Sequence, residues 1–282
     1  MADSTITSRS GVKLPRLVYG TAWKKEKTTS LVEQAIQTGF RGIDTACQPK
    51  HYREDLVGAA LANMQDQGIS RSDIFLQTKF TPVAGQDPQN IPYNNKHSLT
   101  QQVLESFEVS KKNLKTDYVD SLVLHSPYSS TPELMEVWQA MEEIVAKNGA
   151  RQIGISNCYD LKVLKYLEGE SRVKPAVVQN RFYQDTGYDQ GIRQFCSDHQ
   201  IIYQSFWTLT ANPHILESNL LTSLAKKYDS TTVQILFNYL SLRGTVPLTG
   251  TCNQAHMEED LKSFEFSLDE SEAKIIDTVF TS

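Results

Sequence analysis

The chain has 282 residues, of which 39% are hydrophobic and 22% are charged, and its formal net charge is -5 at pH 7. A sizeable core is therefore possible, and this charge balance excludes the basic surface that nucleic-acid binding requires. No apolar run approaches the roughly 18 residues that span a bilayer, and no secretion signal is evident, so we expect a cytoplasmic protein without a membrane partner. The four cysteines lie far apart without a CxxC pair, which predicts neither a metal site nor a disulfide framework.

Short apolar runs alternate with helix-period segments from about residue 15 onward, which is typical of βαβ units and a parallel sheet. A polar N-terminal segment fits a hairpin. The runs expected to form strands are 16–20, 42–46, 73–80, 118–125, 151–156, 176–180, 201–206 and 244–249. Helices are expected near 29–38, 54–67, 99–114, 131–147 and 269–279.

Eight strand and helix pairs without a dividing linker predict one domain over residues 1–282, a closed (β/α)8 TIM barrel. A doubly wound sheet is disfavoured because the stretch from Gly20 to Trp23 is no GxGxxG fingerprint. Gly39 should end the first helix, and Thr131 should cap the helix that Pro132 opens. The segment from Thr81 to His97 is unusually long for a connection, which is commonly a sign of function.

Candidate polar residues follow the predicted strands at their carboxyl ends, and in a barrel these ends converge on one mouth. They are Asp44, Lys79, His125, Ser156, Asn157, Gln179 and Asn180. A lysine, an aspartate, a histidine and a nearby tyrosine in such a mouth suggest a proton donor whose pKa is lowered by a neighbouring cation. Each residue alone would more often be a surface or capping group, but their joint placement favours a site.

Six short motifs in this order resemble the aldo-keto reductase family, and the resemblance covers nearly the whole chain. They are Gly42-Ile-Asp-Thr-Ala46 with Val57-Gly58, Gln77-Thr-Lys-Phe80, Leu122-Val-Leu-His125, Ile153-Gly-Ile-Ser-Asn157, Val178-Gln-Asn180 and Val246-Pro-Leu-Thr249.

The resemblance implies a catalytic tetrad. Tyr52 would donate a proton to the carbonyl oxygen, Lys79 would lower its pKa, Asp44 would pair with Lys79, and His125 would orient the carbonyl. Hydride would come from a nicotinamide, with NADP(H) favoured and NAD(H) possible.

The residues then expected to bind the cofactor are Ser156, Asn157, Gln179, Gln204, Ser205, Thr249, Thr251 and His256. The residues expected to contact the substrate are Trp23, Lys24, His51, Tyr93, Phe206 and Trp207. These aromatic side chains around an open mouth suggest a bulky or aromatic carbonyl compound, although each could equally be a packing residue.

The sequence departs from the family pattern near the donor. The tyrosine usually follows the aspartate by about five residues, but that position is Pro49 here, and counting back from Gly58 places His51 opposite the usual tyrosine. We favour Tyr52 because a phenol beside a lysine suits proton donation, and His51 remains open as the donor or a helper.

Two further departures concern the cofactor and the lid. The Lys-Ser pair that usually follows the proline of the eighth strand reads Leu248-Thr249, and the later arginine corresponds to His256, which weakens the phosphate clamp. The C-terminal lid loop is expected to be short or absent.

The sequence therefore predicts NAD(P)H-dependent reduction of a small-molecule aldehyde or ketone, without nucleic acid, membrane or metal as a partner. An imine reductase is an alternative. A nucleotide-binding regulatory or sensor barrel with little turnover is another, because the donor loop is disturbed.

Overall fold

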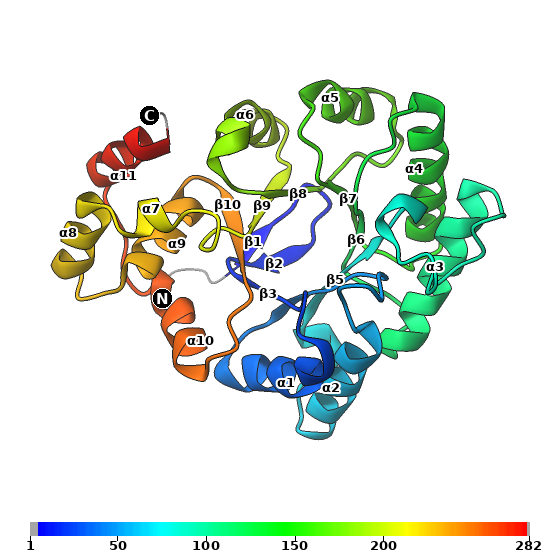
Figure 1. The fold of residues 1–282 in the computed structure, drawn as a ribbon, viewed down its shortest axis with the longest axis horizontal. Helices are drawn as coiled ribbons and strands as arrows, with labels where there is room; N and C mark the ends of the chain where they lie inside the picture. Colours follow the sequence, from blue (N-terminus) through cyan, green and yellow to red (C-terminus); the bar gives the residue numbers. More distant parts are fainter. Residues whose placement is uncertain (1–4, 281–282) are drawn as a thin grey trace.

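The computed structural model describes residues 5–280, in which parallel strands close into a barrel surrounded by helices (Figure 1). Around the barrel the strands follow the order β10-β3-β4-β5-β6-β7-β8-β9. Their bounds are β3 Val18–Gly20, β4 Gly42–Asp44, β5 Phe75–Phe80, β6 Ser121–Leu124, β7 Ile153–Ser156, β8 Val177–Arg181, β9 Ile202–Phe206 and β10 Thr245–Thr249. The closed (β/α)8 barrel expected from the sequence is confirmed.

The helices form the outer ring of Figure 1. Their bounds are α1 Thr28–Thr38, α2 Glu54–Asp66, α3 Leu99–Leu114, α4 Thr131–Ala146, α5 Leu161–Glu170, α6 Gln190–Asp198, α7 Pro213–Leu216, α8 Asn219–Lys227, α9 Thr232–Leu242, α10 Gln254–Leu261 and α11 Glu270–Asp277. Short 3₁₀ turns are η1 Lys25–Lys27, η2 Arg71–Asp73, η3 Val83–Gly85, η4 Gln184–Asp189, η5 Lys262–Phe264 and η6 Thr278–Phe280. Over residues 5–280, every helix is too short or too polar to cross a bilayer.

An antiparallel hairpin precedes the barrel, as expected. Its strands are β1 Thr5–Thr7 and β2 Lys13–Pro15. Leu14 of the hairpin is fully buried and joins an apolar cluster with Val18 and Val246, which belong to the first and last barrel strands. The hairpin therefore closes the end of the barrel at which the strands begin, and leaves the other end as the mouth.

The barrel interior is layered, because alternate residues of a strand face the same side. The layers on β5, β8 and β9, from the closed end to the mouth, are Phe75, Val177 and Ile202, then Gln77, Gln179 and Gln204, then Lys79, Arg181 and Phe206. The first layer is an apolar plug and the second is a hydrogen-bonded amide layer. The polar side chains of these three strands therefore lie in the half of the barrel nearer the mouth.

Two glycines have clear structural reasons. Gly39 has φ 126° where α1 ends, which agrees with its expected role as a helix stop. A Cβ atom on Gly58 of α2 would lie 2.0 Å from the Asn113 carbonyl oxygen of α3, so only glycine allows this close helix contact.

The expected cap of α4 is shifted: the N-cap is Ser130, and Thr131 is already helical.

Candidate active site

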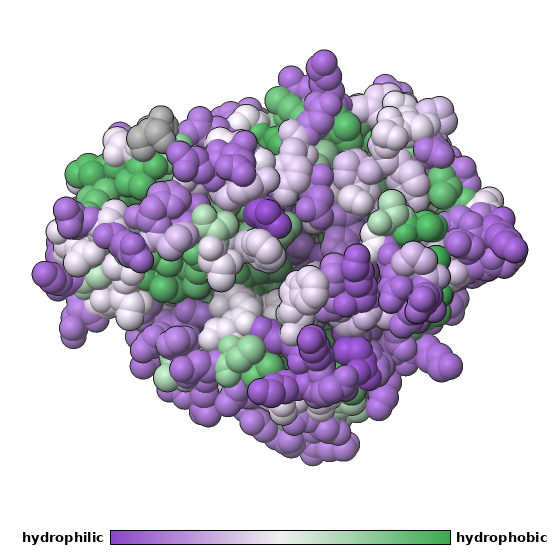
Figure 2. Space-filling model, viewed as in Figure 1, coloured by the Kyte–Doolittle hydropathy of each residue, from purple (hydrophilic) through white to green (hydrophobic). Residues whose placement is uncertain are grey.

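Figure 2 shows the face of the molecule seen in Figure 1, a mostly hydrophilic surface with a recess near its centre. The polar group of the barrel mouth is built on the buried ion pair of Asp44 and Lys79. Lys79 Nζ lies 2.6 and 2.8 Å from the two carboxylate oxygens and donates to the Thr45 carbonyl oxygen at 2.8 Å. Asp44 Oδ1 also accepts from Nε2 of Gln77 and Gln179, at 2.8 and 3.0 Å. Such a charge pair tolerates burial because its other polar atoms are also bonded.

Tyr52 and His125 lie above this pair. Lys79 Nζ is 5.1 Å from the centre of the Tyr52 ring, and the ring centres of Tyr52 and His125 are 6.0 Å apart. Nδ1 of His125 shares a 2.7 Å hydrogen bond with Thr81 Oγ1, which fixes the imidazole. The fold thus brings together the four side chains that were expected to act as one unit.

The pKa directions define the protonation of this group at neutral pH. Desolvation raises the pKa of Tyr52 above its ordinary value of 10, and the Asp44 carboxylate raises it further. This direction is opposite to the expected one, because burial favours the neutral phenol and the Asp44 carboxylate opposes a second negative charge. Burial also lowers the pKa of His125 well below 6.5, with a further contribution from the Lys79 charge. A protonated phenol and a neutral imidazole therefore face each other.

The loop before α2 determines which side chain reaches the ion pair. The backbone N–H groups of His51 and Tyr52 both donate to the Gln48 carbonyl oxygen, at 3.1 and 3.0 Å. Nε2 of Gln48 in turn donates to the Gly85 carbonyl oxygen at 2.6 Å. In this tight turn the His51 ring stacks on Trp23, with ring centres 3.9 Å apart. Tyr52 faces Lys79, whereas the ring contact of His51 is with Trp23.

A buried carboxylate fastens this loop to the barrel. Glu54 in the first turn of α2 accepts hydrogen bonds from the hydroxyl groups of Thr78 and Ser110. Thr78 precedes Lys79 in β5, and Glu54 follows Tyr52 by two residues. Glu54 therefore links the strand that carries the lysine to the loop that carries the tyrosine.

The residues expected to hold the nicotinamide carboxamide lie at the ends of neighbouring strands. Ser156 Oγ donates to the Gln179 carbonyl oxygen at 2.6 Å, and Asn157 Nδ2 donates to the His125 carbonyl oxygen at 2.8 Å. Asn157 has φ 52°, a left-handed conformation of the kind that concentrates at functional sites. With these donors used, the side-chain oxygens of the two residues can accept hydrogen bonds from a carboxamide.

Two of the expected cofactor residues are buried elsewhere. Gln204 accepts hydrogen bonds from Nε2 of Gln77 and Gln179, at 2.7 and 2.9 Å, so it supports the amide layer. Ser205 is fully buried and its hydroxyl oxygen accepts from Thr208 at 2.9 Å. Because adjacent strand residues face opposite sides, Gln204 and Ser205 cannot both face the cofactor, and we leave both out of the proposed binding surface.

The aromatic residues divide into two groups. Trp23 and Trp207 follow strand ends at the mouth and are 57% and 49% exposed, with φ 64° and 56°. Tyr93 is buried: its ring packs against Phe80 with centres 5.5 Å apart, and its hydroxyl donates to the Thr81 carbonyl oxygen at 2.7 Å. These contacts indicate a packing role for Tyr93, which the proposed substrate site therefore omits.

Lys24 is directed away from the catalytic group. Its ammonium donates to the Gly250 carbonyl oxygen and lies 3.4 Å from Sγ of Cys252, both in the loop between β10 and α10. Lys24, which was expected to contact the substrate, instead lies at the loop where the sequence predicts binding of the cofactor phosphates. Lys24 can supply there the positive charge that Leu248 does not.

The other residues expected to bind phosphate differ in whether their side chains have a proton free to donate to a ligand. Thr249 Oγ1 donates to Oδ2 of the buried Asp260 at 2.8 Å, so its proton is already used. Thr251 Oγ1 accepts from the Asn253 N–H at 3.2 Å and keeps its own proton for a ligand. His256 is exposed on α10. Thr251 is therefore a better phosphate donor than Thr249.

Replacing Asp260 with asparagine tests this buried carboxylate. Burial raises the pKa of Asp260 from 3.8 to about 6, and Thr249 and His256 act in the opposite direction. A raised folded-state pKa means that stability is lost as the pH rises from about 4 to above about 6, by up to about 3 kcal/mol. We expect Asp260→Asn to remove this loss. The free energy of unfolding in urea should therefore rise for the variant, relative to wild type, as the pH increases across that range. Glu258→Gln, an exposed change on the same helix, is the control. A difference from wild type that does not vary with pH would contradict the assignment.

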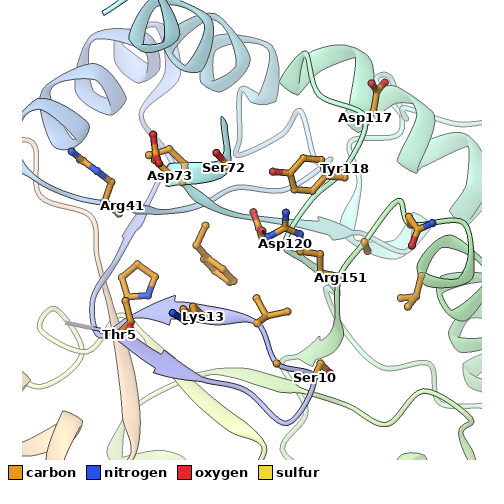
Figure 3. A pocket seen from close by; sticks show the side chains of 18 of the residues that line it. Thr5, Ser10, Lys13, Arg41, Ser72, Asp73, Asp117, Tyr118, Asp120 and Arg151 are labelled. Carbon is orange, nitrogen blue, oxygen red and sulfur yellow. Dashed lines mark ion pairs between the residues drawn. The ribbon is translucent and has the colours of Figure 1, made fainter. Parts of the chain in front are cut away.

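A cleft of about 1020 Å³ lies at the closed end of the barrel, beside the hairpin (Figure 3). Within it Asp120 is paired with Arg71 and Arg151, at 2.8 and 3.0 Å, and both guanidinium groups stack on Tyr118. This end of a β/α barrel usually serves stability, and the paired charges agree with that. No cluster of three or more potential metal ligands occurs within residues 5–280.

Three residues around the ion pair were not expected from the sequence. Gln77 lies two positions before Lys79, so the period of two along a strand is a signal that could have found it. Thr81 and Glu54 depend on contacts between distant segments, and no local pattern reveals them.

Comparison with known proteins gives the family of the chain. The model for the Aldo/keto reductase family matches residues 16–280. Human aldo-keto reductase family 1 member C2 is 28% identical, with 94% of this chain and 88% of that protein covered. The crystal structure of an aldo/keto reductase from Brucella melitensis has a TM-score of 0.82 and 28% identity over 98% of both chains. A Bombyx mori aldo-keto reductase in complex with NADP also has a TM-score of 0.82, with 26% identity over 97% of this chain and 92% of that one. The chain therefore belongs to the aldo/keto reductase family of NAD(P)H-dependent oxidoreductases.

Proposed function

We propose that this protein reduces a bulky or aromatic aldehyde or ketone to the alcohol, with Tyr52 as the proton donor. The observation that carries the proposal is the buried Asp44–Lys79 pair beneath Tyr52, with His125 beside it. Bound nicotinamide supplies the hydride. Negative charge then develops on the carbonyl oxygen, and positioned donors at that oxygen are often the largest catalytic contribution.

Each member of the group has a distinct task. Tyr52 holds its proton at neutral pH, since its pKa lies above the ordinary value of 10, and this proton can be donated once negative charge on the carbonyl oxygen makes that oxygen basic. Lys79, held by Asp44, places a positive charge beneath the phenol and stabilises the phenolate that donation leaves. His125 is neutral, and Thr81 fixes its ring so that the other nitrogen can orient the carbonyl.

Tyr52 is favoured over His51 on geometry. Tyr52 lies over Lys79 and beside His125, whereas the His51 ring is stacked on Trp23. Burial and the Lys50 charge lower the pKa of His51, which makes the proton-carrying form of this imidazole scarcer at neutral pH. His51 and Trp23 instead form an aromatic wall for the substrate.

The residues present fit a nicotinamide dinucleotide. Ser156, Asn157 and Gln179 offer side-chain oxygens as acceptors for the carboxamide N–H groups, and Phe206 provides a ring at the same edge of the mouth. Lys24 and Thr251 lie at the loop expected to bind phosphate. NADP(H) is the favoured cofactor, in agreement with the NADP-bound Bombyx mori relative, and NAD(H) is possible because Leu248 replaces a cation.

The test is to incubate the purified protein with NADPH or NADH and a panel of aromatic aldehydes and ketones, following the absorbance of the reduced cofactor. We expect oxidation of NADPH that depends on the carbonyl compound, and faster turnover with aromatic than with short aliphatic aldehydes. Measurable cofactor binding without oxidation by any carbonyl compound would contradict the proposal and favour a nucleotide-binding role.

A further inference from the structure

Arg181 lies at the mouth of the barrel, where an arginine without an acidic partner is unusual. It is the last residue of β8 and pairs in register with Phe206 of β9. Gln179, two residues earlier on the same side of the strand, reaches Asp44 in the barrel interior. Arg181 therefore lies one layer above the amides, in the layer of Lys79 and at the rim of the mouth.

Aromatic rings hold the guanidinium group in place. Its central carbon is 4.1 Å from the centre of the Trp207 ring and 5.1 Å from that of Tyr183. The backbone N–H of Arg181 donates to the Tyr159 hydroxyl at 3.1 Å, and this hydroxyl lies 3.4 Å from Oδ1 of Asn157. Arg181 is thus connected to the residues expected to bind the nicotinamide.

The N–H groups of Arg181 remain available to a ligand. In the described part of the chain, no carboxylate lies within ion-pair distance of its guanidinium and no side-chain hydrogen bond of Arg181 occurs, whereas Arg71 is paired with Asp120. Stacking on an indole covers one face of the planar guanidinium and leaves its edge donors free. Such an edge can make two parallel hydrogen bonds to one oxyanion.

Trp207 is held in a costly conformation. It has φ 56°, a left-handed conformation that is rare for a large residue, and 49% of it is exposed. Backbone strain of this kind concentrates at functional sites, where the surrounding structure enforces it. The strained turn places the indole against Arg181 before any ligand arrives, so the arginine is pre-organised.

We propose that Arg181, stacked on Trp207, recognises an oxyanion at the mouth: the carboxylate of an anionic carbonyl substrate or the diphosphate of the cofactor. The local charge supports this chemistry, because Asp44 neutralises Lys79 and leaves the Arg181 charge uncompensated in that layer. The identity of the two candidate ligands rests on the proposed reductase function. The binding chemistry itself rests only on Arg181 and its aromatic neighbours.

The experiment compares Arg181→Met and Arg181→Lys with wild type, and uses Lys165→Met, an exposed change on α5, as the control for net charge. The probes are 4-carboxybenzaldehyde and its neutral methyl ester as substrates, and NADPH as the cofactor. Steady-state kinetics gives kcat/KM for both aldehydes, and the fluorescence of bound NADPH gives its Kd. Thermal unfolding verifies that each variant is folded.

Removing a charged hydrogen-bond partner should weaken binding by about tenfold or more in Arg181→Met. A substrate carboxylate is identified if kcat/KM falls for the acid but not for the ester. The cofactor diphosphate is identified if the Kd of NADPH rises while the acid-to-ester ratio is unchanged. Arg181→Lys should lie between Arg181→Met and wild type in either case.

The proposal is overturned if Arg181→Met changes neither quantity, or if Lys165→Met changes them as much. If wild type turns over neither aldehyde, the reductase proposal fails independently. The oxyanion site is then decided by direct titration of wild type and Arg181→Met with NADPH and 4-carboxybenzaldehyde in a calorimeter. Equal Kd values for the two proteins with both probes would overturn it.

Discussion

Tyr52→Phe is expected to reduce kcat for carbonyl reduction by about 10²–10⁴-fold, which is the usual contribution of a positioned general acid. The ring and its contacts with Lys79 and His125 remain in this variant, and only the donated proton is lost. The Kd of NADPH should therefore stay close to that of wild type. Steady-state kinetics with an aromatic aldehyde, together with cofactor titration, measures both quantities.

His51→Ala is the matched comparison, because it changes the adjacent residue of the same turn. It removes the ring that stacks on Trp23, so we expect a higher KM for bulky aldehydes and a kcat near the wild-type value. The assignment of Tyr52 as donor is wrong if Tyr52→Phe keeps full activity while His51→Ala loses it.

Lys79→Met is expected to destabilise the fold by about 3–5 kcal/mol, the usual cost of breaking a buried ion pair. Asp44 would keep its hydrogen bonds from Gln77 and Gln179 but would remain charged in the barrel interior without a cation. Urea unfolding at pH 7 measures the loss. Activity should also fall, because the positive charge beneath Tyr52 is removed.

A double-mutant cycle separates the ion pair from general packing. Asp44→Asn with Lys79→Met removes both charges of the pair, so the double variant should be more stable than the sum of the two single losses predicts. Strictly additive losses would mean that Asp44 and Lys79 do not act as a pair.

The sequence was sufficient for the architecture because local pattern and tertiary structure agree there. The apolar runs at β5 and β9 are strands buried on both faces, and the expected helix 99–114 coincides with α3, where Ser98 caps the first turn. The strands at 16–20 and 118–125 were predicted too long, since apolar residues continue past the barrel hydrogen bonds. An apolar run predicts which residues are buried, and buried residues continue beyond the last hydrogen bond of the strand.

The details of the site depended on contacts that no local pattern encodes. Whether Tyr52 or His51 faces Lys79 is determined by the turn at Gln48, and the Gln48 side chain binds Gly85 from a distant loop. Tyr93 is buried because it packs against Phe80 of β5, and the sequence around Tyr93 alone does not predict this contact. The pKa of Tyr52 rises although a lysine is near, because burial favours the neutral phenol and the Asp44 carboxylate opposes a second negative charge.

The most direct test of the reductase account is transfer of deuterium from cofactor to substrate. NADPH deuterated at one of the two C4 positions of the nicotinamide is incubated with wild type and an aromatic aldehyde, and the product is analysed by mass spectrometry. We predict that one of the two epimers gives an alcohol with a single deuterium on the carbinol carbon, and that Tyr52→Phe forms this product far more slowly. Cofactor binding with no deuterated alcohol from either epimer would contradict the account.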